Sequence, residues 1–158
     1  MLDCFRSEII SLAMDTNIKK ELCIKAISDA YTLRKPGDGV IIHSDAGSQY
    51  TSRKYKKTLG GFHAIQSMRD TAKCYYNAKM ESWFATFNKE KIYKLDTTHM
   101  TVEDVKKEIW RYAFSYYNTV RVTIVTEGGF PPSVNNSKVP TVKSVARKNQ
   151  GVWGLNYY

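Results

Sequence analysis

The sequence is poor in cysteine and in long apolar runs. Its three cysteines, Cys4, Cys23 and Cys74, are widely spaced and form no C-x-x-C pair, so neither a disulfide framework nor a zinc site is expected. No apolar run approaches the roughly 18 residues of a membrane-spanning helix. No basic segment followed by an apolar stretch opens the chain, as it would in a signal peptide. These absences predict a cytoplasmic protein without a membrane partner.

Acidic residues are scarce relative to basic ones. The 158 residues include 24 Lys and Arg against 15 Asp and Glu, a formal net charge of +9. A basic surplus favours a polyanionic partner, because each neutralised phosphate releases condensed counterions. A basic but solvated surface is the alternative. The length suffices for one domain with a real core.

The hydrophobic pattern predicts alternating strands and helices. Strands are expected around residue 2 and over residues 9–14, 40–42 and 63–68. Helices are expected over residues 51–59 and 77–95, and over a segment capped by Thr16 or Asn17 that runs to about residue 33. The apolar residues of this last segment recur at helical spacing and are expected to face inward: Ile18, Leu22, Ala26, Ile27, Ala30 and Tyr31. This alternation predicts the α/β class.

A last helix is predicted from the capping-box pattern Thr101-Val102-Glu103-Asp104. Its spacing turns five side chains inward: Val105, Ile109, Tyr112, Ala113 and Tyr116. Glycine and proline pairs follow beyond residue 118 and break regular structure. We therefore assign residues 1–118 to the core domain and residues 119–158 to an irregular C-terminal extension.

Two acids lie where metal-dependent phosphodiester chemistry needs them. Asp45 follows the apolar strand over residues 40–42, and chemistry collects at such strand ends in α/β sheets. Glu81 lies on the helix predicted over residues 77–95. Two carboxylates on different elements can share divalent cations, and Mg²⁺ takes oxygen ligands. The spacing alone is a weak signal, because most acids are solvated surface residues.

The strings around both acids are far more specific. The run His43-Ser44-Asp45-Ala46-Gly47-Ser48-Gln49-Tyr50-Thr51-Ser52 resembles the H-S-D-x-G-S-Q-Y-T-S signature of bacterial insertion-sequence transposases, in the insertion-sequence family numbered three. The residues around Glu81, namely Ser67-Met68, Cys74-Tyr75, Asn77-Ala78, Ser82 and Lys89-Glu90, resemble the block around that family's last acid. Tyr116-Tyr117-Asn118 with Arg121 resembles its closing element. The resemblance covers about residues 1–134.

The resemblance implies a ribonuclease-H-like integrase core, with a mixed sheet flanked by helices. In that family three acids of the DDE type hold two Mg²⁺ or Mn²⁺ ions; Asp45 corresponds to the second acid and Glu81 to the third. His43, Asn77 and Lys89 correspond to expected DNA contacts, although a packed or hydrogen-bonded His43 is an equal alternative. The implied partners are transposon ends and target DNA, with a second copy or full-length transposase.

The family's first acid lies on a central strand that the resemblance would place before Met1. The strands around Leu2 and Val40 would both pair with it, so backbone groups would lack partners, at about 1–3 kcal/mol for each buried group. Asp3 is interpreted as a turn residue, not as a substitute acid. The family's activity is DNA end cleavage and strand transfer in transposition. We expect this chain alone to be inactive.

Two other interpretations stay open. A non-catalytic DNA-binding or regulatory transposase fragment fits the basic charge and the aromatic helix over residues 109–117, although the spacing of its tyrosines favours core positions. An unrelated metal nuclease would need another acid near the pair, and the sequence offers no compelling candidate.

Overall fold

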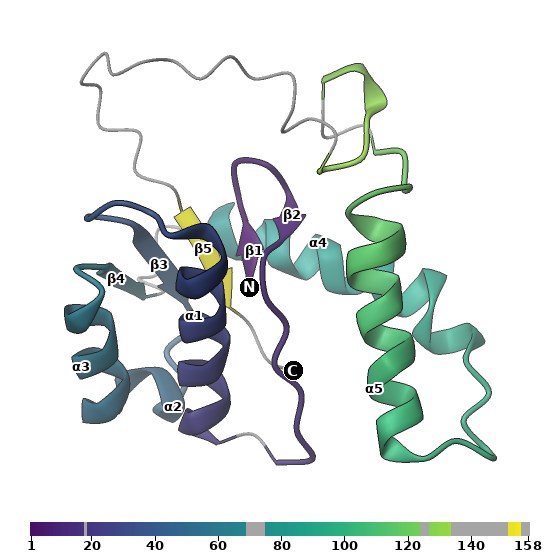
Figure 1. Cartoon of the computed structure of the whole chain (residues 1–158), viewed down its shortest axis with the longest axis horizontal. Helices are drawn as coiled ribbons and strands as arrows, with labels where there is room; N and C mark the ends of the chain where they lie inside the picture. Colours follow the sequence, from purple (N-terminus) through teal and green to yellow (C-terminus); the bar gives the residue numbers. More distant parts are fainter. Residues whose placement is uncertain (18, 69–74, 124–126, 134–151, 156–158) are drawn as a thin grey trace. The chain divides into compact units, whose positions relative to one another are not determined.

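A computed structural model describes residues 1–17, 19–68, 75–123, 127–133 and 152–155 (Figure 1). The chain divides into two compact units. The first contains residues 1–5, 10–81 and 149–158, and the second contains residues 6–9 and 82–148. Within the described residues, no helix has the length and apolar character to cross a membrane. Cys4 and Cys23 are buried and form no disulfide within the described residues, and Cys74 lies outside the described residues.

The first unit holds a mixed sheet. Its strands are β1 (Leu2–Asp3), β3 (Ile41–Ser44), β4 (Ile65–Met68) and β5 (Val152–Leu155), in the spatial order β1-β5-β3-β4. β3 is parallel to both β4 and β5, and β5 is antiparallel to β1. A mixed sheet with α1, α2 and α3 in the same unit agrees with the predicted α/β class (Figure 1).

Strand β5 corrects the expectation of an irregular tail for its four residues. It lies between β1 and β3, with Leu2 opposite Gly154 on one side and Ile41 opposite Val152 on the other. The backbone groups of β1 and β3 that were predicted to lack partners therefore face a strand. The tail was misjudged because ladder hydrogen bonds are made by backbone atoms, and a four-residue segment with a glycine carries little strand pattern.

The predicted strand over residues 9–14 is also corrected. Only Glu8–Ile9 forms a strand, β2, and it belongs to the second unit. Beyond it, Ile10 N donates to Met1 O at 2.9 Å, and the Met1 amino group donates to Ser11 O. Buried Ser11 Oγ donates to Ala26 O of α1 at 2.6 Å, and residues 10–14 form no further strand.

Helix α1 (Lys20–Arg34) buries the predicted residues Leu22, Ala26, Ile27, Ala30 and Tyr31, together with Cys23. The predicted Ile18 lies outside the described residues. The predicted N-cap was wrong, because Lys19 holds that position without a side-chain hydrogen bond. Thr16 is instead engaged with Asp15, whose Oδ1 accepts from the Thr16 amide at 2.7 Å. The helix ends where Lys35 adopts a left-handed conformation (φ 44°) and its amide donates to Tyr31 O at 2.9 Å.

Two helices replace the one predicted over residues 51–59. They are α2 (Ser48–Thr51) and α3 (Arg53–Gly61), separated by extended Ser52, whose Oγ accepts from Tyr55 N at 3.3 Å. Tyr50 and Tyr55 are buried, and their rings meet edge to face at 5.3 Å. They join the core of the first unit, which also contains Met1, Ile10, Cys23, Ala26, Ile27, Ala30, Tyr31, Val40, Ile42 and Leu59.

Helix α4 (Tyr75–Glu90) begins in the first unit and continues in the second. It is followed by the 3₁₀ turn η1 (Ile92–Lys94), so the predicted helix ends five residues early. Helix α5 (Val102–Trp110) starts with the predicted capping box: Asp104 N donates to Thr101 Oγ1 at 3.2 Å, and Thr101 N donates to Asp104 Oδ2 at 3.1 Å. A short 3₁₀ turn, η3 (Glu127–Gly129), follows later in the second unit.

The segment after α5 is a π-helix, η2 (Arg111–Tyr117). Tyr112 and Ala113 are buried as predicted, but Tyr117 is 7% exposed while Tyr116 is 43% exposed. The prediction for Tyr116 was wrong because a π turn is wider than an α turn and shifts the inward face along the sequence. Tyr117 packs edge to face on Trp83, with ring centroids 5.9 Å apart.

Candidate active site

Asp45 lies directly after β3, as predicted for a ligand-holding acid. Its Oδ1 accepts a hydrogen bond from Gly47 N at 3.0 Å, which orients the carboxylate. A Cβ at Gly47 would lie 2.7 Å from Gln49 Nε2 and 3.0 Å from Asp45 Oδ1, so a larger residue there would have to displace the Gln49 side chain. Asp45 Oδ2 accepts no hydrogen bond from the described residues. The half-buried carboxylate therefore keeps one oxygen for a ligand.

His43 is held inside the sheet of the first unit. It is 1% exposed, and its Nδ1 lies 3.1 Å from Ser67 Oγ, the residue opposite it on β4. This geometry supports the packed, hydrogen-bonded alternative for His43. Its contact with DNA stays a prediction, and its clearest role is to fix the end of β3 that carries Asp45.

The residues predicted on α4 have different surroundings. Glu81 is exposed and belongs to the same compact unit as Asp45, whereas exposed Lys89 belongs to the second unit. For Asn77 the structure describes the backbone within α4 but not the side chain. Lys79 donates a hydrogen bond to Cys4 O, which ties the first part of α4 to the turn after β1. A shared site of Asp45 and Glu81 stays a proposal.

Within the described residues, no group of three or more His, Cys, Asp or Glu side chains is placed to hold a metal ion. Asp3 Oδ1 accepts from Phe5 N at 2.9 Å, as expected of a turn residue. Asp45 and Glu81 thus remain the acids that the sequence nominates.

Sequence reasoning missed the role of Glu90. Arg121 Nε and Nη2 donate to Glu90 Oε1 at 3.0 and 2.8 Å, Nε also reaches Oε2 at 3.0 Å, and Tyr112 OH donates to Oε2 at 2.8 Å. These bonds, first those from Arg121, hold the pKa of Glu90 below its usual range. Glu90 and Arg121 both lie in strings that resemble the family, which was the available signal.

Helix α3 presents a basic surface in the first unit. Arg53, Lys54, Lys56 and Lys57 are exposed, and no acidic residue lies on this helix. Lys54 reaches Glu21 of α1 at 3.4 Å, a long and exposed ion pair. The helix begins six residues after Gly47, so this positive surface follows the Asp45 turn closely in the sequence.

Solved structures show which fold this is. The chain is similar to the HTLV-2 integrase catalytic core domain in complex with magnesium. For the dimeric form, the TM-score is 0.55 at 16% identity, over 84% of this chain and 77% of that chain. For the trimeric form, the TM-score is 0.57 at 16% identity, over 84% and 79%. The fold is that of a ribonuclease-H-like integrase core, which confirms the predicted fold class.

Sequence comparisons agree with this class. Residues 1–74 match the family model described as the integrase core domain. Over 121 residues the chain is 35% identical to the transposase for insertion sequence element IS904 of Lactococcus lactis subsp. lactis (strain IL1403), covering 77% of this chain and 47% of that protein. Over 136 residues it is 26% identical to the putative transposase InsK for IS150 of Escherichia coli (strain K12), covering 86% and 47%. The chain spans about half the length of these relatives. The chain is thus similar to the integrase core domain over residues 1–74 and to insertion-sequence transposases over a longer stretch.

Proposed function

We propose that this chain acts in DNA transposition, as part of a DDE core that cleaves DNA at element ends and joins it to a target. Asp45 and Glu81 are the proposed metal-holding acids. The observation that carries the proposal is the position of Asp45. It follows a central strand of an integrase-type sheet, one oxygen is fixed by Gly47 N, and the other accepts no bond within the described residues.

The two acids fit a divalent metal by their chemistry. Both offer carboxylate oxygens, which Mg²⁺ and Mn²⁺ accept. When bound, such ions stabilise the charge that develops on the attacking and leaving oxygens of a phosphodiester. The contribution of the chain is to orient Asp45 through the Gly47 amide and to hold the end of β3 through the contact of His43 with Ser67. Two ions, as in the intact family site, are part of the proposal.

DNA is the proposed partner, at transposon ends and at the target. The four exposed cations of α3 support it, because a helix without acids attracts phosphates along its length. Lys89 and Asn77 on α4 are further proposed contacts, and His43 is the weakest of the three because it is buried. A second copy of the chain or a full-length transposase is the proposed protein partner.

Metal binding by the acid pair tests the proposal directly. Mn²⁺ titration followed by electron paramagnetic resonance should show a site that is lost in the variant Asp45→Asn, Glu81→Gln. The matched control is Asp38→Asn, Glu103→Gln, which removes the same charge from exposed acids elsewhere. The control should bind Mn²⁺ like the wild type. Equal Mn²⁺ binding by both variants would contradict the proposed acid pair.

Nicking of supercoiled DNA in Mg²⁺ or Mn²⁺ extends the test to chemistry. Any metal-dependent nicking should disappear in the Asp45→Asn, Glu81→Gln variant and persist in the control. Nicking that survives this variant would exclude the pair as the catalytic acids. Little nicking is expected from the chain alone, because no group of three acidic side chains is placed to hold a metal within the described residues.

A second candidate is a non-catalytic DNA-binding fragment that regulates transposition. The basic surface of α3 favours it independently of the acids. This function predicts DNA binding that is equal in the wild type and in the Asp45→Asn, Glu81→Gln variant, with no specific Mn²⁺ site. The Mn²⁺ titration therefore separates the two candidates.

A further inference from the structure

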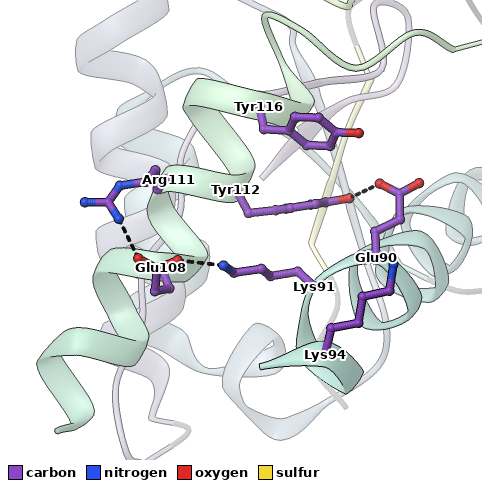
Figure 2. Close-up of a pocket in the computed structure, with 7 residues that line it drawn as sticks. All are labelled: Glu90, Lys91, Lys94, Glu108, Arg111, Tyr112 and Tyr116. Atoms are coloured by element: carbon purple, nitrogen blue, oxygen red, sulfur yellow. Dashed lines mark hydrogen bonds and ion pairs between the residues drawn. The ribbon is translucent and has the colours of Figure 1, made fainter. Parts of the chain in front are cut away.

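A pocket of about 360 Å³ lies in the second unit, between the end of α4 with η1 and the helix formed by α5 and η2 (Figure 2). Its size falls in the range of about 300–1,000 Å³ typical of small-ligand sites. It is lined by cations, acids and tyrosines: Glu90, Lys91, Lys94, Glu108, Arg111, Tyr112 and Tyr116. Neither the acid pair nor the proposed DNA contacts lie among these residues.

Both acids of the pocket are already bonded at each oxygen. Glu108 Oε2 lies 2.6 Å from Lys91 Nζ, and Glu108 Oε1 lies 2.5 Å from Arg111 Nη1 (Figure 2). Glu90 is occupied by Arg121 and by the Tyr112 hydroxyl, as described above. The bond from Lys91 holds the pKa of Glu108 below its usual range. Both carboxylates are therefore ionised at neutral pH, and each is already bonded to neighbouring cations or to the Tyr112 hydroxyl.

The cations of the pocket exceed these acids. Lys91 and Arg111 both pair with Glu108, so these three groups carry a net charge of about +1. Arg121 neutralises Glu90. Lys94 adds a further positive charge to the pocket. Within the described part of the chain, no hydrogen bond or ion pair reaches the Lys94 ammonium. Arg111 has five N–H donors, and only one is bonded to Glu108. The pocket thus offers unused donors and a net positive charge, which suit a phosphate group.

The aromatic wall adds a second requirement for the ligand. Tyr112 is buried and its hydroxyl is bound to Glu90, whereas Tyr116 is 43% exposed. The two rings are 5.5 Å apart and tilted by 44°. An exposed ring beside unused cations provides a stacking surface for a flat base. A ligand that carries both a phosphate and a planar ring uses both features, whereas a purely acidic peptide uses only the charge.

We propose that this pocket binds one nucleotide unit of a nucleic-acid strand, with the phosphate at Lys94 and Arg111 and the base against Tyr116. This proposal rests on the proposed function in taking nucleic acid as the partner, and it adds a contact site in the second unit. The pocket would grip a strand independently of the acid pair.

The test measures binding of a 5′-fluorescein-labelled dT12 strand to the full chain by fluorescence anisotropy, without divalent metal. Lys94→Gln should raise the Kd about five- to tenfold and lower the slope of log K against log salt by about 0.7, the value for one phosphate of a single strand. Tyr116→Ala should raise the Kd at least about fivefold, and Tyr116→Phe should restore it. Both side chains are exposed, so thermal unfolding of each variant should match the wild type.

Matched controls separate the pocket from general charge and aromaticity. Lys107→Gln removes an exposed lysine of α5 outside the pocket, and Tyr93→Ala removes a tyrosine that is 78% exposed in η1. Both should bind dT12 within about twofold of the wild type. Equal losses in the controls and in the pocket variants would overturn the proposal.

Competitors decide the class of ligand. Excess dT12 should displace the probe through the pocket, whereas poly-L-glutamate and free dTMP should compete weakly. Poly-L-glutamate that competes as well as dT12, together with an unaffected Tyr116→Ala variant, would make the pocket an acidic-peptide site and overturn the proposal. Strong competition by dTMP would point to a free nucleotide and overturn the strand assignment.

The acid pair provides the final control. The Asp45→Asn, Glu81→Gln variant should bind dT12 through the pocket like the wild type. Suppose that this variant and the wild type bind Mn²⁺ equally, and that dT12 still binds through the pocket. This result would support the pocket and reject the proposed acid pair. The reverse pattern, an intact Mn²⁺ site with dT12 affinity insensitive to Lys94→Gln and Tyr116→Ala, would reject the pocket alone.

Discussion

The side chain of Asn118 pairs with the backbone of Ile9 through two hydrogen bonds. Ile9 N donates to Asn118 Oδ1 at 2.9 Å, and Asn118 Nδ2 donates to Ile9 O at 2.8 Å. Both residues are buried in the second unit. The amide of Asn118 therefore takes the place of a neighbouring strand for β2. This explains physically why an asparagine closes the Tyr116-Tyr117-Asn118 string that resembles the family.

Replacing Asn118 by alanine should destabilise the protein strongly. Asn118→Ala leaves the N–H and the C=O of Ile9 without partners, at about 1–3 kcal/mol for each buried group. Urea unfolding followed by tryptophan fluorescence should show a lower midpoint with an unchanged slope. The control Thr119→Ala removes an exposed neighbour whose hydroxyl donates to Ser115 O, and it should change stability little. Similar midpoints for the two variants would contradict the role of Asn118.

The sequence was most informative where residues act through periodic burial. The inward face of α1 was predicted because leucine, isoleucine and alanine recur at helical spacing along it. The predicted inward position of Tyr116 in η2 was wrong, because a π turn departs from the α-helical spacing on which the prediction depended. The cap of α1 was wrong because Thr16 bonds Asp15 in the preceding loop instead. Such local choices depend on competing hydrogen bonds that a hydrophobic pattern does not record.

In the candidate site, too, some features could be predicted from the sequence and others could not. The apolar run over residues 40–42 predicted that Asp45 lies at a strand end, and the structure places Asp45 directly after β3 with the Gly47 bond. Burial of His43 could not be predicted, since the same histidine suits a ligand and a packed position. The pair of Glu90 and Arg121 joins residues 31 positions apart. Contacts of that kind arise from the packing of separate elements, which spacing along one element cannot reveal.

The ion pair of Glu90 with Arg121 should make stability depend on pH. Since the folded-state pKa of Glu90 lies below its unfolded value, the unfolded chain binds the proton more readily. The stabilisation is present above the unfolded-state pKa of about 4.3. It is lost as the pH falls through the folded-state pKa. A double-mutant cycle of Glu90→Gln and Arg121→Gln should give a coupling of about 1 kcal/mol at pH 6.

Urea unfolding between pH 6 and pH 3 measures this coupling. It should shrink toward zero at the acid end, because protonated Glu90 no longer carries the charge that Arg121 binds. A coupling that stays constant over this range would show that the pair acts through packing alone. The stacking position of Arg121 over Tyr117, 5.7 Å from the ring centroid, is the contact that would then explain it.

The cations of α3 should set part of the salt dependence of binding to duplex DNA. Each phosphate contact contributes about 0.9 to the slope of log K against log salt. The variant Lys56→Gln, Lys57→Gln should therefore lower the slope by about 2 if both lysines contact phosphates. Lys19→Gln, Lys25→Gln removes the same charge from exposed residues before and within α1 and should leave the slope nearly unchanged. Equal slopes for the two variants would assign DNA binding to a different surface.

Strand β5 should be necessary for the sheet of the first unit, because it has a neighbour on each side. Gly154 lies opposite Leu2 of β1 and opposite His43 of β3. Gly154→Pro removes a backbone donor inside this strand and clashes with the ladder. The control Gly154→Ala keeps the N–H. Hydrogen exchange of the β3 amides, Ile41–Ser44, should accelerate strongly in the proline variant and little in the alanine variant. Unchanged protection in the proline variant would mean that β3 is held without β5, and that β4 and the core beneath it suffice to position Asp45.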